Sequence, residues 1–319
     1  MRKFPGQLSR FRLVCHIFWM MSVDAVLIAG PTASGKSAVA LALAERLGGT
    51  IVNTDSMQVY RETRILTARP SAEDEARAPN LLYGHVGVRE PYSVGRYQQD
   101  AARALAAARP LIFAGGTGLY FAALTEGLAD IPPVPADIRE AVRARREEIG
   151  AEAFHAELIA RDPNSASLRA SDTQRTLRAA EVLEATGEPL STWQKQAGKP
   201  VLAGLKLARC VISPPRPVLR ARIGARFDAM LKAGAMEEAA LLEGLPPSLP
   251  AAKILGLREL WAVRAGTSTL DAARTLAKTA SRQYAKRQIT WFRHRMADWR
   301  WLEGDDLSKI IPEILSQVI

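Results

Sequence analysis

The eight residues at positions 30–37 read GPTASGKS, and the interpretation of the whole chain starts from them. The apolar run AVLIA precedes them at 25–29, and AVALALAERLGG follows at 38–49, which predicts a buried strand, a glycine-rich loop and a helix. Glycines in such a loop let backbone N–H groups turn toward phosphate oxygens, and the helix start adds the positive end of its dipole. Lys36 supplies a point charge, and the Ser37 hydroxyl can ligate Mg²⁺. The stretch predicts a phosphate site without identifying the phosphate compound.

Further short apolar runs predict a parallel sheet around this loop. They are TIVNT at 50–54, LIFAG at 111–115 and ARCVIS at 208–213, each bounded by turn residues. Amphipathic helical stretches separate the first three runs, as in α/β proteins whose buried parallel strands are covered by helices. The gap before the fourth run is too long for one crossover. We therefore expect an α/β fold with a P-loop NTPase-like parallel sheet core and an inserted all-helical subdomain.

Two turns at the ends of these strands carry candidate site residues. Asp55 follows the second strand, and the carboxyl ends of parallel strands are where open α/β sheets build their sites. Three roles are open for Asp55: magnesium ligand, general base, or cap of the next turn. AGGTGLY at 114–120 is a second glycine-rich turn, which either brings Thr117 to the same edge or is an ordinary tight turn. LIFAGG lacks the aspartate that ATPases place after this strand, which weakens an ATPase interpretation.

The expected domains follow from composition along the chain. IPPVP at 131–135 and GKPVLAG at 198–204 bracket charged helical segments, in which Ser171 and Gln174 are spaced as a capping box and Gly187 as a stop. We expect residues 136–204 to form the helical insertion and residues 22–135 with 205–319 to form the catalytic core. The basic, apolar leader at 1–21 is interpreted as an N-terminal extension outside the fold, with Met21 as the true start.

The composition is that of a globular protein, with 48% hydrophobic and 24% charged residues. Lys plus Arg number 43 against 33 Asp plus Glu, so the net charge is +10 and a polyanionic partner is favoured. Cys15 and Cys210 are too few for a disulfide framework, which indicates a reducing cytoplasm. The four histidines are scattered without zinc spacing, and no apolar run reaches the length of a membrane-spanning helix.

The segment 270–295, LDAARTLAKTASRQYAKRQITWFRHR, predicts a basic helix. Spacing of four places Arg274, Lys278, Arg282 and Lys286 on one stripe, and no acid occurs from Ala272 to Ala297. Such a stripe is either a solvated helix face or a phosphate contact. The absence of acidic residues favours contact with RNA phosphates, and aromatic residues between the cations favour it as well. The alternative role of these aromatic residues is packing in the core. These aromatic residues are Tyr284, Trp291 and Phe292.

From about Val23 to the C-terminal region, the chain resembles the tRNA dimethylallyltransferases, also called tRNA isopentenyltransferases. The resemblance rests on motifs in the same order: GPTASGKS, DSMQVY, AGGTGLY, DTQRTLRAAEV, RPVLRARIGARF, KILGLREL and YAKRQITWFR. In that family the loop grips the diphosphate of dimethylallyl diphosphate while N6 of an adenosine in the tRNA anticodon loop attacks the allylic carbon. The resemblance implies that the phosphate is a leaving group, that Mg²⁺ assists, and that the adenosine is extruded from its stack.

The resemblance also assigns roles to residues. Asp55 corresponds to the catalytic aspartate that takes the amine proton, Thr117 to a residue near the target adenosine, and Arg222 to a cation that stabilises the departing diphosphate. The donor is held by Gly30, Pro31, Thr32, Ala33, Ser34, Gly35, Lys36 and Ser37, with Mg²⁺ near Ser37. The implied tRNA contacts are Asp55, Ser56, Met57, Gln58, Thr117, Arg139, Gln174, Arg175, Thr176, Leu177, Arg178, Lys286, Arg287 and Arg293. We expect a cytoplasmic monomer without a membrane segment.

Some positions depart from the family pattern, and other functions remain open. RETRILTARP at 61–70 carries Arg69 where the family has lysine, and Leu257 stands where a tyrosine is usual. A P-loop small-molecule kinase would use Asp55 to activate an acceptor hydroxyl. An isopentenyltransferase for free adenine nucleotides would need neither the insertion nor the basic helix. A non-catalytic RNA-binding protein would not explain Lys36, Ser37, Asp55 and Thr117 together.

Overall fold

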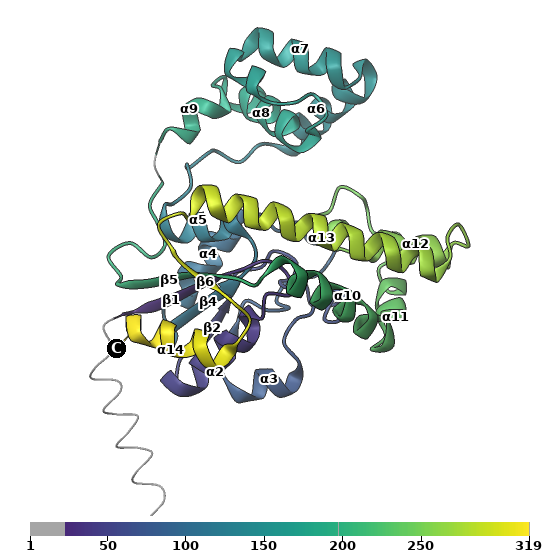
Figure 1. Cartoon of the computed structure of the whole chain (residues 1–319). Coiled ribbons are helices and arrows are strands. Elements are labelled where there is room, and N and C mark those ends of the chain that lie inside the picture. The colour runs from purple at the N-terminus through teal and green to yellow at the C-terminus, as the bar shows by residue number, and fades with distance from the viewer. Residues whose placement is uncertain (1–22, 197, 319) are drawn as a thin grey trace, which may run out of the picture. The chain divides into compact units, whose positions relative to one another are not determined.

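The computed structural model describes residues 23–196 and 198–318, so the predicted extension at 1–21 lies outside the described residues. The centre is a six-stranded sheet in the order β3-β2-β4-β1-β5-β6, and every neighbouring pair is parallel (Figure 1). The strands are β1 (Ala25–Ala29), β2 (Thr50–Asn53), β3 (Asn80–Leu81), β4 (Leu111–Gly115), β5 (Leu207–Ser213) and β6 (Arg300–Glu303). The predicted α/β class with a parallel sheet is confirmed.

The strand order brings three loops together. The chain runs from β1 to β2, but β4 lies between these two strands in the sheet. The carboxyl ends of β1, β4 and β2 are therefore neighbours, and such a point is where open α/β sheets bind ligands. The loops that leave these ends are the glycine-rich loop, the 114–120 turn and the Asp55 turn.

The two outermost strands, β3 and β6, were not predicted from the sequence. β3 has two residues and β6 reads RWLE, with its two end residues exposed. An edge strand is paired on one side only and is partly exposed to solvent. Runs this short or this polar therefore lack the apolar pattern that predicts a buried strand.

The side chains of β1 alternate between two hydrophobic clusters, one on each face of the sheet. Val26 and Ile28 pack in a cluster with helices α2 (Lys36–Leu47) and α14 (Leu307–Val318). Figure 1 shows these two helices together on one side of the sheet, with α3 (Ala72–Arg77) beside them. Because both faces of β1 are covered, the strand is apolar throughout, as the AVLIA run indicates.

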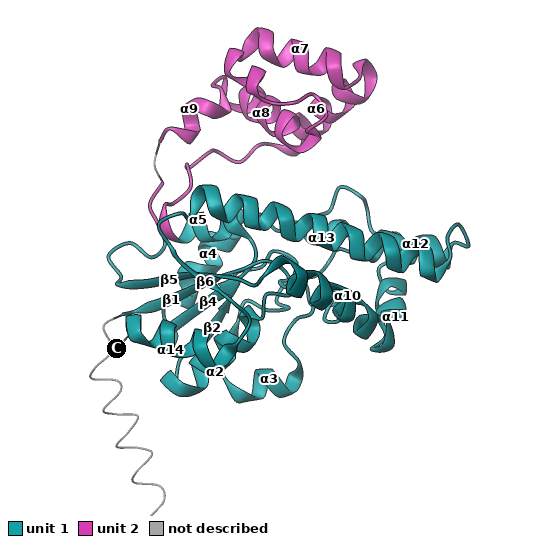
Figure 2. Ribbon diagram, viewed as in Figure 1, with its two compact units in different colours: residues 1–124, 201–319 teal, residues 125–200 magenta. Residues whose placement is uncertain are grey.

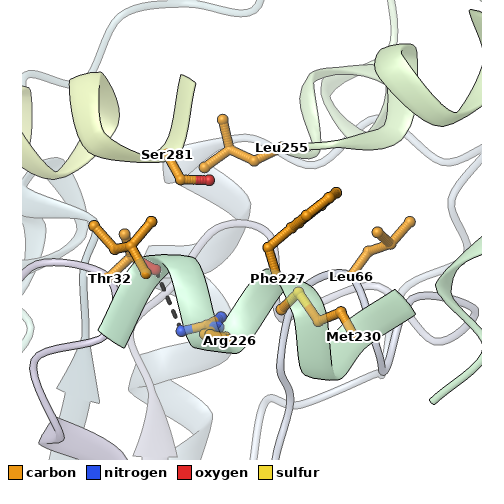
Figure 3. A pocket seen from close by; sticks show the side chains of 8 residues that line it. Thr32, Leu66, Arg226, Phe227, Met230, Leu255 and Ser281 are labelled. Atoms are coloured by element: carbon orange, nitrogen blue, oxygen red, sulfur yellow. Dashed lines mark hydrogen bonds between the residues drawn. The ribbon is translucent and has the colours of Figure 1, made fainter. Parts of the chain in front are cut away.

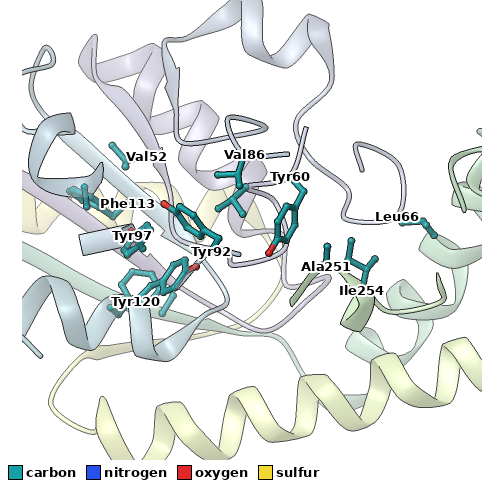
Figure 4. Close-up of a cluster of buried hydrophobic side chains, with 14 of the residues drawn as sticks. Val52, Tyr60, Leu66, Val86, Tyr92, Tyr97, Phe113, Tyr120, Ala251 and Ile254 are labelled. Carbon is teal, nitrogen blue, oxygen red and sulfur yellow. The ribbon is translucent and has the colours of Figure 1, made fainter. Parts of the chain in front are cut away.

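The other face of the sheet carries a larger cluster that includes several tyrosines (Figure 4). Helices α4 (Val94–Ala104) and α5 (Gly118–Thr125) supply Tyr97 and Tyr120, whose rings stack with centroids 3.8 Å apart. The Tyr97 hydroxyl donates to Oγ1 of Thr54 at 3.2 Å. This buried contact fixes the backbone directly before Asp55.

The C-terminal helices complete this layer. They are α10 (Arg216–Lys232), α11 (Ala235–Ala240), the 3₁₀ turn η2 (Pro250–Lys253), α12 (Leu257–Arg264) and α13 (Leu270–Arg295). The Thr269 side chain caps α13 by accepting the N–H of Ala272, and Ala277 and Phe292 on this helix join the large cluster. The basic segment thus has a buried side that packs on the core.

The chain divides into two compact units, which Figure 2 distinguishes by colour. The first contains the described residues up to Leu124 and from Val201 onward, and the second is Thr125–Pro200. The second unit begins and ends earlier in the chain than the predicted insertion at 136–204. Its helices are α6 (Ala136–Ile149), α7 (Ala151–Arg161), the 3₁₀ turn η1 (Pro163–Ser167), α8 (Thr173–Thr186) and α9 (Leu190–Gln194). They enclose a small core of their own, which includes Phe154, Leu158 and Leu183.

The predicted capping box at the start of α8 is wrong. The cap is Asp172, whose side chain accepts the N–H of Arg175, so Ser171 and Gln174 do not form the box. An aspartate caps a helix as well as a serine does, and spacing alone could not distinguish the two neighbours. Gly187 ends the helix as predicted, with a left-handed φ of 72°.

Candidate active site

The glycine-rich loop connects β1 to α2 and is held by short backbone contacts. The Ser34 N–H donates to the Pro31 carbonyl at 3.1 Å, and Gly35 adopts a φ of 92°, which favours glycine. The Ser34 hydroxyl is buried without a hydrogen-bond partner in the described part of the chain. A methyl group on Gly30 would stand 2.6 Å from that hydroxyl oxygen, so glycine is required there. An unpaired hydroxyl inside such a loop is suited to a phosphate oxygen.

Lys36 lies at the start of α2 with its ammonium folded over the loop, where Nζ donates to the Pro31 carbonyl at 3.4 Å. Burial lowers the pKa of Lys36 to about 8; Arg226 acts in the same direction and Asp55 opposes it. These three charged side chains are therefore close enough to affect one another. The group is positioned to bind an anion, which would compensate the buried charge.

Ser37 is exposed on the first turn of α2, and its hydroxyl has no hydrogen-bond partner among the described residues. Within 23–196 and 198–318, no group of three or more His, Cys, Asp and Glu residues could hold a metal ion alone. Magnesium suits this arrangement, because it commonly keeps water ligands and shares substrate phosphate oxygens with few protein groups. Ser37 is the residue that would contribute to it.

Asp55 occupies a turn built by its own neighbours. Its N–H donates to Oδ1 of Asn53, and its Oδ1 accepts the N–H of Met57 at 3.0 Å. The capping role left open by the sequence is therefore present, as a turn at the end of β2. A methyl group on Gly116 would lie 3.3 Å from Asp55 Oδ2 and 3.4 Å from the Gly30 carbonyl. The second carboxylate oxygen thus faces the place where the three loops meet.

Thr117 is tied to the Asp55 turn through backbone and side chain. Its N–H donates to the Thr54 carbonyl at 3.2 Å, and its Oγ1 accepts the Ser56 N–H at 2.9 Å. Gly115 allows this approach, because a methyl group there would lie 1.9 Å from the Thr54 carbonyl oxygen. The 114–120 turn is therefore part of the site and fixes one hydroxyl beside the carboxylate.

One face of α13 packs against the same turn. Gln288 Nε2 donates to the Gly116 carbonyl at 2.8 Å, while its Oε1 accepts the Thr32 N–H at 2.9 Å. A methyl group on Gly118 would stand 2.2 Å from the Trp291 ring. Burial raises the pKa of Tyr284, the charge of Asp55 adds to this, and a hydrogen bond with Thr117 opposes it. The residues that contact the turn, Tyr284, Gln288 and Trp291, follow the i, i+4, i+7 spacing of one helix face.

The sequence interpretation missed the roles of Tyr284 and Gln288. The motif YAKRQITWFR was assessed by its cations and by its aromatic residues, as RNA contacts or core residues, whereas in the structure Gln288 bonds to the 114–120 turn and Tyr284 and Trp291 lie against it. The available signal was their helical spacing of i, i+4 and i+7, which defines one face of the helix, with Lys286 on the other side.

Helix α10 adds two arginines. Arg222 Nη2 pairs with Asp305 Oδ2 at 3.3 Å, and its Nη1 would lie 3.7 Å from a methyl group on Gly35. The resemblance to the dimethylallyltransferases implied that Arg222 serves the diphosphate, and the side chain does lie beside the loop. One turn further on, Arg226 contacts Thr32 (Figure 3), which the sequence interpretation did not foresee.

Comparison with known proteins places this arrangement in a family. The "IPP transferase" family model matches residues 58–295, and the "Isopentenyl transferase" model matches residues 23–82. The chain belongs to the IPP transferase family. This confirms the resemblance.

Relatives of this IPP transferase chain match along almost their whole length. The tRNA dimethylallyltransferase of Nitrobacter hamburgensis is 50% identical over 302 residues, covering 91% of this chain and 95% of the relative. That of Parvibaculum lavamentivorans is 52% identical over 299 residues, covering 92% and 95%.

Two solved structures are similar as well. The tRNA isopentenylpyrophosphate transferase of Bacillus halodurans has a TM-score of 0.64 and 31% identity, covering 93% of this chain and 97% of that one. A eukaryotic dimethylallyltransferase acting on tRNA has a TM-score of 0.74 and 25% identity, covering 90% and 75%. The helices described here include none long and apolar enough to cross a membrane.

Several residues predicted to contact tRNA also hold the IPP transferase core together. Gln58 is buried, and its Nε2 donates to the carbonyls of Thr67 and Ala68 at 3.0 and 2.9 Å. Ser56 and Met57 are half-buried and donate their N–H groups to Thr117 and Asp55. In the structure, the hydrogen bonds of this DSMQ turn hold the loops of the site in place. Its contact with tRNA stays a prediction.

The basic stripe on α13 is less uniform than predicted. Lys278 Nζ lies 2.7 Å from Asp228 of α10, and Arg274 Nε lies 3.5 Å from the same carboxylate. The expectation of missing acidic partners is thus wrong for this end of the stripe, because the acid comes from another helix. Further along, Lys286, Arg287 and Arg293 are exposed, and Arg287 lies over the Tyr284 ring at 5.7 Å.

In the helical unit, the predicted tRNA residues differ in exposure. Arg139, Gln174 and Arg175 are exposed, whereas Thr176 is buried and its hydroxyl donates to the Asp172 carbonyl at 3.0 Å. Leu177 packs against the small core, and Arg178 lies 4.0 Å from Glu181. Their contact with tRNA stays a prediction.

Proposed function

We propose that this chain transfers the dimethylallyl group of dimethylallyl diphosphate to N6 of an adenosine in the tRNA anticodon loop, at position 37 on the 3′ side of the anticodon, and releases diphosphate. The observation that carries the proposal is the meeting of a phosphate loop, Asp55 and Thr117 at one sheet edge in an IPP transferase. The kinase and free-nucleotide alternatives are not favoured, because tRNA dimethylallyltransferases match about nine-tenths of the chain.

The donor side of the reaction needs charge stabilisation. The bond between C1 and the diphosphate oxygen breaks, and its electron pair leaves with the diphosphate. The loop N–H groups, Lys36 and Arg222 are the groups we assign to that developing charge, since preformed donors stabilise it without reorganisation. Mg²⁺, held by Ser37 and the diphosphate oxygens, would neutralise further charge when bound.

The acceptor side needs a base. As the bond between N6 and C1 forms, the nitrogen becomes cationic and acidic, and Asp55 takes its proton. The Oδ2 atom is the suitable one, because Oδ1 already accepts the Met57 N–H. Thr117 orients the amine, and it is itself fixed by its contact with Ser56.

The partners follow from the same reaction. tRNA is the acceptor, and the exposed cations of α13 together with those of the helical unit are the contacts we propose for it. An enzyme with this substrate works in the cytoplasm, where tRNA matures. We further propose that it acts as a monomer.

The test is direct. Purified protein is incubated with Mg²⁺, dimethylallyl diphosphate and total tRNA, the tRNA is digested to nucleosides, and mass spectrometry follows adenosine. We expect a prenyl-sized mass gain that requires the donor. Consumption of ATP with a small acceptor, and no change in adenosine, would contradict the proposal.

A further inference from the structure

Asn53 is a buried amide at the end of an otherwise apolar stretch. It is the last residue of β2, directly follows Ile51 and Val52, and is 0% exposed. Removing an amide from water is costly unless its donors and its oxygen find partners in the protein. The partners of the Asn53 side chain therefore indicate what it does.

These partners are the backbone of Asp55 and the backbone of Leu82. Asn53 Oδ1 accepts the Asp55 N–H at 2.9 Å, and Nδ2 donates to the Asp55 carbonyl at 2.9 Å. Nδ2 also donates to the Leu82 carbonyl at 3.0 Å, so both donors and the oxygen of the amide are bonded. One side chain thus holds Asp55 by the backbone group before its Cα and by the one after it.

The contact with Leu82 joins the DSMQ turn at 55–58 to the segment 82–84, which follows β3. Leu82 has a left-handed φ of 63°, a conformation that is costly for leucine and persists only where surrounding contacts hold it. The Gly84 N–H donates to the Gln58 carbonyl at 3.0 Å, so the same segment also reaches the far end of the turn. Asn53 and the segment 82–84 therefore hold both ends of the turn that carries Asp55.

A backbone held in this way determines where the Asp55 carboxylate lies. Its Oδ1 accepts the Met57 N–H at 3.0 Å, and its Oδ2 would lie 3.3 Å from a methyl group on Gly116, at the place where the three loops meet. A base must lie within hydrogen-bond reach of the proton that it removes. A small rotation of the Asp55 backbone would move Oδ2 away from that place.

We propose that Asn53 is a positioning residue for the transfer, which fixes the backbone of Asp55 so that Oδ2 points at the N6 proton of the adenosine. The inference rests on the proposed function and adds to it the residue that orients the base. Asn53 acts through Asp55 and exchanges no proton, so N6 still gives its proton to Asp55 as the N6–C1 bond forms. Because misplacement of a reacting group by about 1 Å can cost about 100-fold in rate, loss of Asn53 slows the chemical step more than it weakens substrate binding.

The experiment compares two substitutions in the full-length protein that separate hydrogen bonding from space filling. Asn53→Leu keeps a side chain of similar size and removes all three hydrogen bonds, whereas Asn53→Ser is smaller but its hydroxyl can still accept the Asp55 N–H, as serines do in such turns. We expect single-turnover transfer to tRNA at saturating substrates to fall about 10- to 100-fold in Asn53→Leu and about 3- to 10-fold in Asn53→Ser. Affinities for tRNA and for inorganic pyrophosphate should stay within about threefold of the wild type in both variants, since the substrate contacts are retained.

Asn80→Leu is the matched control, because Asn80 lies on the neighbouring strand β3 and its Nδ2 donates to the Ala78 carbonyl instead of to the Asp55 turn. Its transfer rate should stay within about twofold of the wild type, as it does for substitutions away from the reacting groups. If Asn53 only fills space, Asn53→Leu should be the faster of the two Asn53 variants.

A double-mutant cycle with Asp55→Asn tests whether Asn53 acts through Asp55. Once the base is removed its position no longer matters, so Asn53→Leu should slow the remaining transfer by less than about twofold in that background. Asn53→Ser carries both comparisons if Asn53→Leu does not fold. A wild-type rate in either Asn53 variant, a faster rate in Asn53→Leu than in Asn53→Ser, or effects that multiply in the cycle overturn the inference alone. A wild-type protein that leaves adenosine unmodified overturns the proposed function as well.

Discussion

Gln288 accepts the backbone N–H of Thr32 at 2.9 Å, although 256 positions separate the two residues in the chain. The nitrogen of the same amide donates to the Gly116 carbonyl at 2.8 Å. One buried side chain on α13 therefore joins the phosphate loop to the turn that carries Thr117. Donor and acceptor loops are held in register by a residue of the helix whose exposed side carries the predicted tRNA contacts.

Replacing Gln288 should separate the two loops. Gln288→Met keeps the length of the side chain but removes both hydrogen bonds, and Gln288→Glu keeps the acceptor and loses the donor. Because misplacement of reacting groups by about 1 Å can cost about 100-fold in rate, we expect kcat to fall by about 10- to 100-fold, with a smaller change in the KM for tRNA. Steady-state kinetics check this, with the exposed Gln283→Met as control. Equal loss of kcat in both Gln288 variants and in the control would contradict a positioning role.

The packing of Trp291 on Gly118 leads to a stability prediction. A methyl group at position 118 would overlap the Trp291 ring, so Gly118→Ala should destabilise the fold by about 1–3 kcal/mol, as overpacking does. Gly224→Ala in α10 is the matched control, because a methyl group there meets nothing within 4 Å. It should stabilise by about 0.5–1 kcal/mol, since alanine favours the helix. Urea unfolding of both variants measures the difference, and equal stabilities would contradict the close contact.

The sequence predicted those parts of the site that depend on local pattern. The loop from Gly30 to Ser37 needs its glycines and its flanking strand and helix, and Asp55 and Thr117 directly follow apolar strands. Each of these features is visible within about ten residues, so motif and periodicity were sufficient.

The rest of the site depends on contacts between distant segments. Gln288 touches Thr32 and Gly116 only after α13 packs across the sheet edge, and Asp228 neutralises Lys278 from another helix. A single sequence does not show which helices become neighbours, and so the stripe was expected to lack acidic partners. The edge strands β3 and β6 were not predicted, because a strand that is paired on one side only needs no strong apolar pattern.

Asp55 allows a substitution that separates chemistry from structure. Asp55→Asn keeps the oxygen that accepts the Met57 N–H, so the turn should persist and tRNA binding should change by less than about threefold. The amide cannot take a proton from N6, so single-turnover transfer should fall by about 10² to 10⁴-fold. Rapid-quench measurement at saturating substrates checks the rate, and a filter-binding assay checks the affinity. Near-normal transfer by Asp55→Asn would remove Asp55 from the role of base.

Cys210 should be inert while the protein is folded. It is buried on β5, its Sγ donates to the Leu27 carbonyl at 3.5 Å, and burial raises the pKa of its thiol to about 12. In a Cys15→Ser variant at pH 8, a thiol reagent should therefore react after unfolding and not before. The unfolded thiol ionises near 9.0 and the folded one near 12, so the unfolded chain loses protons first and stability falls as pH rises above about 9. Cys210→Ala should flatten this decline, and rapid labelling of the native protein would contradict the burial.

The two ends of the basic stripe on α13 should respond differently to salt. Lys286, Arg287 and Arg293 are exposed cations without a carboxylate in ion-pair distance among the described residues, whereas Lys278 is held by Asp228. Each phosphate contact that is lost reduces the slope of log K against log salt by about 0.7 to 0.9, because fewer counterions are released. We expect Lys286→Gln, Arg287→Gln and Arg293→Gln each to weaken tRNA binding and to reduce this slope.

Lys278→Gln should leave the slope unchanged and cost at most about 1 kcal/mol of stability, as the loss of a partly exposed ion pair does. Binding of tRNA at a series of salt concentrations measures the slopes; if Lys278→Gln changes the slope as much as Arg287→Gln does, then Asp228 does not withdraw Lys278 from RNA contact.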